Sequence, residues 1–306
     1  MSHLQAQVVV GLGEVLWDCL PDGRLPGGAP ANVAYHANQL GCLGIICSRV
    51  GTDVLGDEYL EFAASRNLKT DWIQRDAQHC SGRAEVQLDA QGQPAFVIHD
   101  NVAWDHLQAT PDARALIRRA AAVCFGTLAQ RAETARTAIH DLLAEAGSDC
   151  LVVYDVNLRQ EWYQRAWIEA SLARADVVKL NHEEALVLSR LLELEEDRLP
   201  DIATAVLQRY EMALVCITRG AQGSLLVTHQ ACVDQPGTSA ETGDTVGAGD
   251  AFTAALIYSH WQNWDLSHRG QFANQIAGLV ASRSGAMPDL TAEFFELRRQ
   301  FGDHLR

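Results

Sequence analysis

The stretch Leu151-Val-Val-Tyr-Asp-Val-Asn-Leu-Arg159 places four consecutive apolar residues before a group of polar ones. An apolar run of this length is typical of a strand that is buried on both faces of a parallel sheet. Comparable runs lie at 8–11, 44–47, 121–125, 176–178 and 214–217, and stretches with helical spacing lie at 31–40, 133–144 and 202–210. Strands that alternate with helices in this way predict an α/β fold with a mostly parallel central sheet and helices on both faces.

Polar residues follow three of these runs, and they are Asp155, Asn157, Asn181, Thr218 and Arg219. In open α/β sheets, ligands bind beyond the carboxyl ends of the strands. We therefore expect these side chains to border one crevice.

Residues 82–100 depart from the alternation of strands and helices. Apolar residues occur there at every second position on either side of a turn at 89–92, a pattern that predicts a β-hairpin. Together with the polar stretch 18–25, this hairpin predicts a small sheet that projects from the main domain. We interpret the small sheet as a lid; the alternative is an ordinary hairpin on a sheet edge. The chain is thus expected to form a single domain, 1–306, with lid segments at about 15–27 and 80–105.

The composition excludes several classes of partner. The chain has 306 residues and a formal net charge of -15, which argues against nucleic acid and anionic membranes as partners. No apolar run approaches the ~18 residues that a membrane helix needs. The first residues lack the basic and apolar segments of a secretory signal, so we expect a cytoplasmic protein.

The lysine content limits how the protein can bind phosphate. Only Lys69 and Lys179 occur, and neither lies in a G-x-x-x-x-G-K-[ST] segment, so a Walker-type phosphate loop is excluded. A dinucleotide fingerprint also fails, because Leu16 stands where the third glycine after Gly11 and Gly13 is required. The eight cysteines contain no C-x-x-C pair, and the histidines form no metal or nucleophile pattern.

The segment Gly243-Asp-Thr-Val-Gly-Ala-Gly-Asp-Ala-Phe252 precedes a helical stretch at 251–261. Small residues at 247–249 allow a phosphate to approach the backbone N–H groups at a helix N-terminus, where the helix dipole favours negative charge. Asp250 can then accept the proton of a hydroxyl that attacks the phosphorus. The alternative is that Asp250 is an N-cap on a Gly-rich turn.

Five motifs in order resemble those of the PfkB, or ribokinase-like, family of carbohydrate kinases. They are Gly11-Leu-Gly-Glu14 with Asp18, Gly27-Gly-Ala-Pro-Ala-Asn-Val-Ala34, Asn181-His-Glu-Glu184, Thr218-Arg-Gly-Ala-Gln-Gly223 and Asp244-Thr-Val-Gly-Ala-Gly-Asp250. The motifs run from Gly11 to Asp250, across almost the whole chain. It implies a ribokinase-like three-layer α/β/α sandwich with a small β-sheet lid, and an ATP-dependent sugar kinase.

The resemblance also implies roles at the phosphate. Asp250 is the catalytic base, and the N–H groups around Gly247, Ala248 and Gly249 form an anion hole. Asn181 and Glu184 organise Mg²⁺ through its waters, which suits a cation that keeps much of its hydration. The alternative to a role at Mg²⁺ is that these two residues begin a helix, with Asn181 as N-cap and Glu184 three residues later.

For the nucleotide, the resemblance implies that Thr218, Gly220 and Gly223 line the phosphates and ribose, with Gly249 beside them. The alternative for Thr218-to-Gly223 is a strand-to-hairpin turn. Asn274 is placed beside the adenine, although a lone Asn on a helix is usually a solvated residue. A K⁺ site, where the family has one, would use Asp244 and the carbonyl of Val246.

For the sugar, the candidates are Asp18, Gly28, Asn32, Asn157 and Arg159, since carboxylate and amide groups pair well with neighbouring hydroxyls. The alternatives are a plain loop at 27–28 before a helix, and a surface ion pair for Arg159. Two large apolar residues of the lid, Phe96 and Trp104, are expected to close over the sugar.

The sugar motifs are most similar to those of bacterial fructokinases, with one departure at Val156, where the family usually has proline. A 2-keto-3-deoxygluconate kinase comes second because residues 99–106 lack the arginine that a carboxylate substrate favours. Ribokinase or nucleoside kinase comes third. A non-catalytic sugar-binding protein is the alternative from another class, but it would have no need of a base such as Asp250. By resemblance only, the protein would form a homodimer through its lid.

Overall fold

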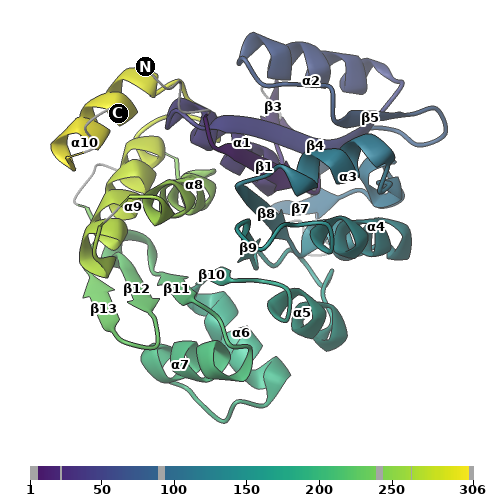
Figure 1. Cartoon of the computed structure of the whole chain (residues 1–306). Helices are drawn as coiled ribbons and strands as arrows, with labels where there is room; N and C mark the ends of the chain where they lie inside the picture. Colours follow the sequence, from purple (N-terminus) through teal and green to yellow (C-terminus); the bar gives the residue numbers. More distant parts are fainter. Residues whose placement is uncertain (1–5, 21–22, 89–93, 239–243, 263, 303–306) are drawn as a thin grey trace.

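The computed structural model describes residues 6–20, 23–88, 94–238, 244–262 and 264–302. Its central feature is a nine-stranded sheet (Figure 1). The strand order is β13 (Cys232–Gln235), β12 (Ser224–Val227), β11 (Leu214–Thr218), β10 (Val177–Asn181), β9 (Leu151–Asp155), β8 (Ala122–Gly126), β1 (Val8–Leu12), β4 (Leu43–Gly51) and β5 (Ile73–Asp76). The β11–β12 and β12–β13 pairs are antiparallel and the other pairs are parallel. The mostly parallel sheet predicted from the apolar runs is confirmed.

Helices cover both faces of this sheet, because successive strand residues point to opposite sides. Val9 and Val153 pack in one buried cluster and their neighbours Val10 and Val152 in another. The cluster with Val9 includes helices α1 (Ala29–Gln39), α8 (Ala248–His260), α9 (Leu266–Ala281) and α10 (Thr291–Gln300). The cluster with Val10 includes α3 (Pro111–Arg118), α4 (Glu133–Leu143), α5 (Arg165–Leu172), α6 (His182–Leu192) and α7 (Leu199–Arg209). Helix α2 (Val54–Ser65) packs near β4, in a third buried cluster.

A second, four-stranded sheet stands apart from the main one. Its order is β3 (Gly23–Gly27), β2 (Leu16–Leu20), β6 (Gly82–Leu88) and β7 (Pro94–Ile98). The antiparallel β6–β7 pair confirms the predicted hairpin, whose turn lies outside the described residues. One face of β2 packs on α2, where Trp17 meets Tyr59 edge-on with ring centroids 5.8 Å apart.

The cysteines that lie within the apolar runs of the strands are buried. Cys47, Cys124 and Cys216 are at most 1% exposed, and burial raises the pKa of each thiol. Within the described residues, no group of three or more His, Cys, Asp or Glu side chains is placed to hold a metal ion. No helix in the same part of the chain is long and apolar enough to cross a membrane.

Candidate active site

A cavity of about 620 Å³ lies at the carboxyl ends of the central strands, between the two sheets. Asn157, Asn181 and Thr218 reach it from the segments that end β9, β10 and β11. The small sheet contributes Leu16 and Asp18 to the opposite wall. Other predicted site residues in the wall are Gly28, Asn32, Arg159, Gly247, Gly249 and Asp250. The crevice predicted from the strand ends therefore exists for three of the five residues. Asp155 and Arg219 are not in its wall: Asp155 pairs with Lys179, and Arg219 pairs with Asp234.

A second cavity of about 370 Å³ adjoins the first. Small residues dominate its wall, and the predicted nucleotide-site residues found there are Thr218, Gly220, Gly223, Ala248, Gly249 and Asn274. The two cavities share Asn181, Thr218, Thr245 and Gly249. They therefore adjoin along a common wall that includes Gly249, in the first turn of α8.

Gly223, in the wall of the second cavity, packs tightly against the end of β13. Its φ is +92°, and a Cβ there would lie 2.1 Å from the carbonyl oxygen of Gln235. Asn274 is 8% exposed, and its Nδ2 donates to the carbonyl oxygen of Pro236 at 3.0 Å. This asparagine therefore ties α9 to the segment after β13, and is not the solvated residue that a lone helical Asn would suggest.

Asp250 lies in the first turn of α8 and lines the larger cavity. Gly247 is the N-cap, with φ +78°, so the interpretation of Asp250 as the N-cap is wrong. The Asp250 carboxylate accepts a hydrogen bond of 2.7 Å from Asn32 Nδ2 on α1. Burial, and then the charge of Asp155, raise the pKa of Asp250 to about 6, while Lys179, Asn32 and Arg159 act in the opposite direction. A carboxyl group with this pKa is ionised at neutral pH and basic enough to take a proton.

The loop before α8 is fixed by close packing. A Cβ on Gly247 would lie 2.6 Å from the Ala286 backbone, so only glycine fits. The Asp244 carboxylate accepts hydrogen bonds from the amides of Val246 at 3.0 Å and Gly285 at 3.1 Å. The Ala248 amide donates to the carbonyl oxygen of Thr245 at 3.3 Å. The next N–H groups of α8 have no intrahelical acceptor, because they lie in the first turn, and they are donors beside Asp250.

The predicted capping box at the end of β10 is present. Asn181 Oδ1 accepts from the Glu184 amide at 2.9 Å, and Glu184 Oε2 accepts from the Asn181 amide at 2.7 Å. Glu184 Oε1 also accepts from the Leu158 amide at 2.8 Å. Asn181 borders the cavity, and Glu184 is 5% exposed behind it. The helix-start interpretation is correct for both residues, and it leaves the Asn181 side chain at the cavity wall.

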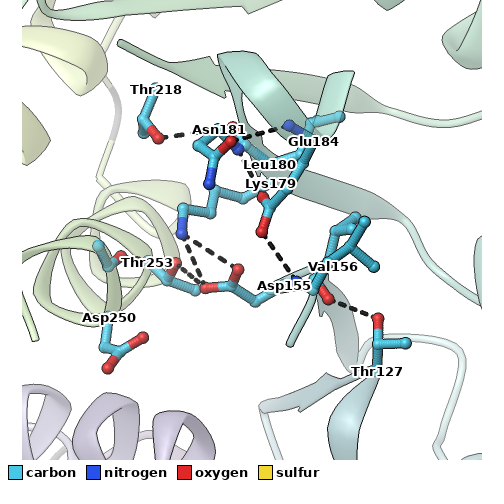
Figure 2. A network of polar contacts seen from close by, with 12 residues as sticks. Thr127, Asp155, Val156, Lys179, Leu180, Asn181, Glu184, Thr218, Asp250 and Thr253 are labelled. Carbon is cyan, nitrogen blue, oxygen red and sulfur yellow. Dashed lines mark hydrogen bonds and ion pairs between the residues drawn. The ribbon is translucent and has the colours of Figure 1, made fainter. Parts of the chain in front are cut away.

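Lys179, to which the sequence assigned no role, enters the same cavity from β10 (Figure 2). Its Nζ lies 3.1 Å and 3.2 Å from the two carboxylate oxygens of Asp155 on β9. Thr253 on α8 donates to Asp155 Oδ2 at 2.8 Å. Burial alone would lower the pKa of Lys179, but the charges of Asp155, Glu184 and Asp250 raise it, so the ammonium stays protonated.

Glu14 is a second residue that the sequence left without a role. It is 2% exposed in the cavity wall, and its Oε1 accepts from the Ala29 amide at the start of α1 at 3.3 Å. Oε2 is buried without a partner among the described residues. Burial raises the pKa of Glu14 to about 7, so a substantial fraction is protonated near neutral pH and can donate to a ligand.

Burial also raises the pKa of Asp18, on the small sheet, while Arg159 lowers it. Arg159 and Asp18 therefore lie close enough to interact across the cavity. The apolar part of the small-sheet wall consists of Leu16, Ala84 and Ile98.

The structure corrects the assignment of Trp104 to the sugar site. Trp104 is 0% exposed in the hydrophobic core, under Arg131, whose guanidinium carbon lies 4.0 Å from its ring centroid. Arg131 in turn makes a buried ion pair of 2.8 Å with Asp105. Trp104 therefore supports the segment after the hairpin and does not line the cavity. Phe96 lies on β7, but its side chain is outside the described part of the chain.

The profile of the pfkB family carbohydrate kinases matches residues 22–293. The chain belongs to the pfkB family of carbohydrate kinases. It is 31% identical over 298 residues to the sugar kinase PH1459 of Pyrococcus horikoshii, with 91% of each chain covered. It is also 31% identical over 257 residues to the fructokinase of Escherichia coli, with 80% of this chain and 82% of the relative covered.

Solved structures agree with this assignment. The PH1459 kinase in complex with ATP is 29% identical to this chain and superimposes with a TM-score of 0.77, covering 92% of this chain and 94% of the other. The fructokinase of Vibrio cholerae O395 with fructose, ADP and calcium is 25% identical, with a TM-score of 0.79 and coverage of 96% and 99%. This pfkB-family kinase thus has the ribokinase-like fold, with a large sandwich and a smaller separate sheet.

Proposed function

We propose that this sugar kinase transfers the γ-phosphoryl group of ATP to a hydroxyl of fructose, with Asp250 as the general base. One observation carries the proposal: Asp250 lines the larger cavity, and the residue before it, Gly249, lines both cavities. A sugar in the larger cavity and a nucleotide in the smaller one would therefore meet at this carboxylate. Such positioning is most of what phosphoryl transfer requires from a protein.

The smaller cavity is suited to ATP. Its wall of glycine and alanine lets a flat base and a phosphate chain approach the backbone, and it ends at the α8 N-terminus, which favours anions. The amides around Gly247, Ala248 and Gly249 are the proposed anion hole. Fructokinase and PH1459 structures with ADP or ATP have the same overall fold, which supports this placement.

Two cation sites belong to the proposal. Asn181 would hold a water of Mg²⁺, with Glu184 fixing the asparagine from behind. Both Glu184 carboxylate oxygens already accept amide hydrogen bonds, which favours contact through water over direct ligation. Bound Mg²⁺ would neutralise charge on the nucleotide phosphates. For K⁺, Asp244 and the carbonyl of Val246 remain the proposed ligands.

The larger cavity is suited to a neutral, polyhydroxylated substrate. Three carboxyl groups, those of Glu14, Asp18 and Asp250, line it with the amides of Asn32 and Asn157. Such groups accept hydrogen bonds from hydroxyls. The relatives named fructokinase, at about 30% identity over most of the chain, support fructose among neutral sugars.

A keto acid such as 2-keto-3-deoxygluconate remains the second candidate because Arg159 lines the cavity. A carboxylate there would compete with Asp18 and Glu14 for this guanidinium. Among the described residues in the wall of this cavity, Arg159 is the one arginine. The charge balance of the wall therefore favours the neutral sugar.

The deciding experiment is an ADP-release assay over fructose, ribose, tagatose, 2-keto-3-deoxygluconate, inosine and adenosine, with and without K⁺. We expect fructose to give the highest kcat/KM. A higher value for the keto acid or a nucleoside would overturn the choice of sugar, and equal rates with and without K⁺ would remove the K⁺ site.

A further inference from the structure

We propose that Lys179 is a catalytic cation of this kinase, whose ammonium group donates a hydrogen bond to the phosphoryl group while it passes from ATP to the sugar. The proposal rests on phosphoryl transfer at the first turn of α8, as proposed above. Sequence patterns exclude a Walker lysine, yet one of the only two lysines of the chain reaches the phosphate end of the cavity from a β-strand.

The Lys179 ammonium group lies beside the first turn of α8. Lys179 lies in the cavity wall with Gly247, Gly249 and Asp250. A Cβ placed on Gly249 would be 3.1 Å from Lys179 Nζ. The ammonium thus lies against the turn whose amides would bind the phosphoryl oxygens. Figure 2 shows it joined to Asp155, which is joined in turn to Thr253 of α8.

The Lys179 ammonium group also has a hydrogen-bond donor available for a ligand. An ammonium group has three N–H bonds, and the two Asp155 carboxylate oxygens, 3.1 Å and 3.2 Å from Nζ, engage at most two of them. Among the described residues, no other protein acceptor bonds to Nζ. Because Lys179 is 6% exposed, the third N–H has only the cavity to point into.

The Lys179 ammonium group is also held rigidly by its partner. Asp155 is 2% exposed and is fixed from α8 by Thr253, at 2.8 Å. In the next strand, Lys179 is the direct register partner of Asp155. A donor fixed in this way needs no reorganisation when charge develops, which is the condition under which such donors are most effective.

The transfer balances as follows. The sugar oxygen forms a bond to the γ-phosphorus, and the bond between this phosphorus and the β,γ-bridging oxygen breaks, leaving its electron pair on ADP. The hydroxyl proton moves to the Asp250 carboxylate. Lys179 keeps all its protons and opposes the negative charge on the phosphoryl oxygens. Its charge also lowers the pKa of Asp250, which keeps the base ionised.

The rival explanation is that Lys179 only neutralises Asp155. Removal of one partner of a buried ion pair is destabilising, whereas removal of both charges is often tolerated. The informative variant is therefore the double substitution Lys179→Met with Asp155→Asn, which leaves no charge uncompensated. Lys179→Gln alone is the second variant.

The test measures kcat with ATP and fructose, and separately the affinity for ADP with aluminium fluoride, Mg²⁺ and fructose by calorimetry. If Lys179 contacts the phosphoryl group, the double variant folds, keeps its fructose KM within about threefold, and loses kcat by at least ~10²-fold, as for loss of one fixed donor. Its affinity for the ADP–aluminium fluoride mimic falls by a similar factor, and its affinity for ADP alone does not change. Wild-type kcat and mimic affinity in either folded variant would overturn the proposal.

Asp250→Asn, measured in parallel, separates this proposal from the proposed function. If Asp250→Asn turns over normally, the base assignment fails irrespective of the lysine variants. If Asp250→Asn is inactive while the double variant is active, only the role of Lys179 is refuted.

Discussion

The sugar end and the nucleotide end of the site differ in whether side chains or backbone form the wall. At the sugar end, side chains form the wall, among them Glu14, Asp18, Asn32 and Arg159. At the nucleotide end, the backbone forms much of it, at Gly220, Gly223, Gly237 and Gly278. Side chains can be exchanged while the fold stays the same, whereas a backbone surface is lost when a Cβ fills it. The sugar end can therefore change its specificity more easily than the nucleotide end can.

The largest effect is expected from a change at the backbone end. Gly223→Val should raise the KM for ATP by about 10²-fold, because the new side chain displaces the segment at Gln235 and misplaces the phosphates. The fructose KM should stay within threefold. Gly147→Val, at a glycine with open space around it, is the matched control. A normal KM for ATP in Gly223→Val would mean that the backbone does not form the nucleotide site.

At the sugar end, Asp18→Ala should raise the fructose KM by about 10-fold to 10²-fold, the cost of a lost hydrogen bond to a charged group. Calorimetry should show unchanged ATP affinity. The matched control is Asp149→Ala, at an exposed aspartate in a loop remote from the cavity. Equal fructose affinity in Asp18→Ala and the control would contradict the assignment of Asp18 to the sugar.

The pH dependence of the activity should follow the ionisation of Asp250. The pKa of Asp250 is raised to about 6, and a general base acts only when ionised. Activity should therefore be complete well above pH 6, and kcat/KM for fructose should fall about tenfold per unit below it. Binding of ATP, measured over the same range, serves as the control. A flat kcat/KM profile down to pH 5 would contradict a base with this pKa.

The smallest effect is expected at the apolar part of the small sheet. Ile98→Ala should raise the fructose KM about threefold, since the side chain is already half exposed and only a few methylene groups are lost. Val54→Ala, at a residue 68% exposed on α2, should have no effect. If Ile98→Ala binds fructose as tightly as wild type, the small sheet does not act as a lid through this wall.

The residues that could be predicted from the sequence are those whose roles depend on local structure. The capping box of Asn181 and Glu184 and the glycine turn before α8 involve neighbouring residues, so their spacing alone indicates them. The strand runs likewise predict the sheet, because burial on both faces leaves a continuous apolar pattern.

The residues that could not be predicted depend on contacts between distant segments. Lys179 meets Asp155 only because β9 and β10 pair in one particular register. The burial of Glu14 depends on its contact with the first turn of α1. Trp104 looked like a lid residue from its place after the hairpin, and its burial depends on Arg131, which follows β8. Such pairings carry no signal in a single sequence.

The measurement that tests the central claim most directly is the kcat of Asp250→Asn with ATP and fructose, together with calorimetric affinities for both substrates. If Asp250 is the base where the two cavities meet, kcat falls by at least ~10²-fold and both affinities stay within about threefold. Wild-type turnover in this folded variant would contradict the claim.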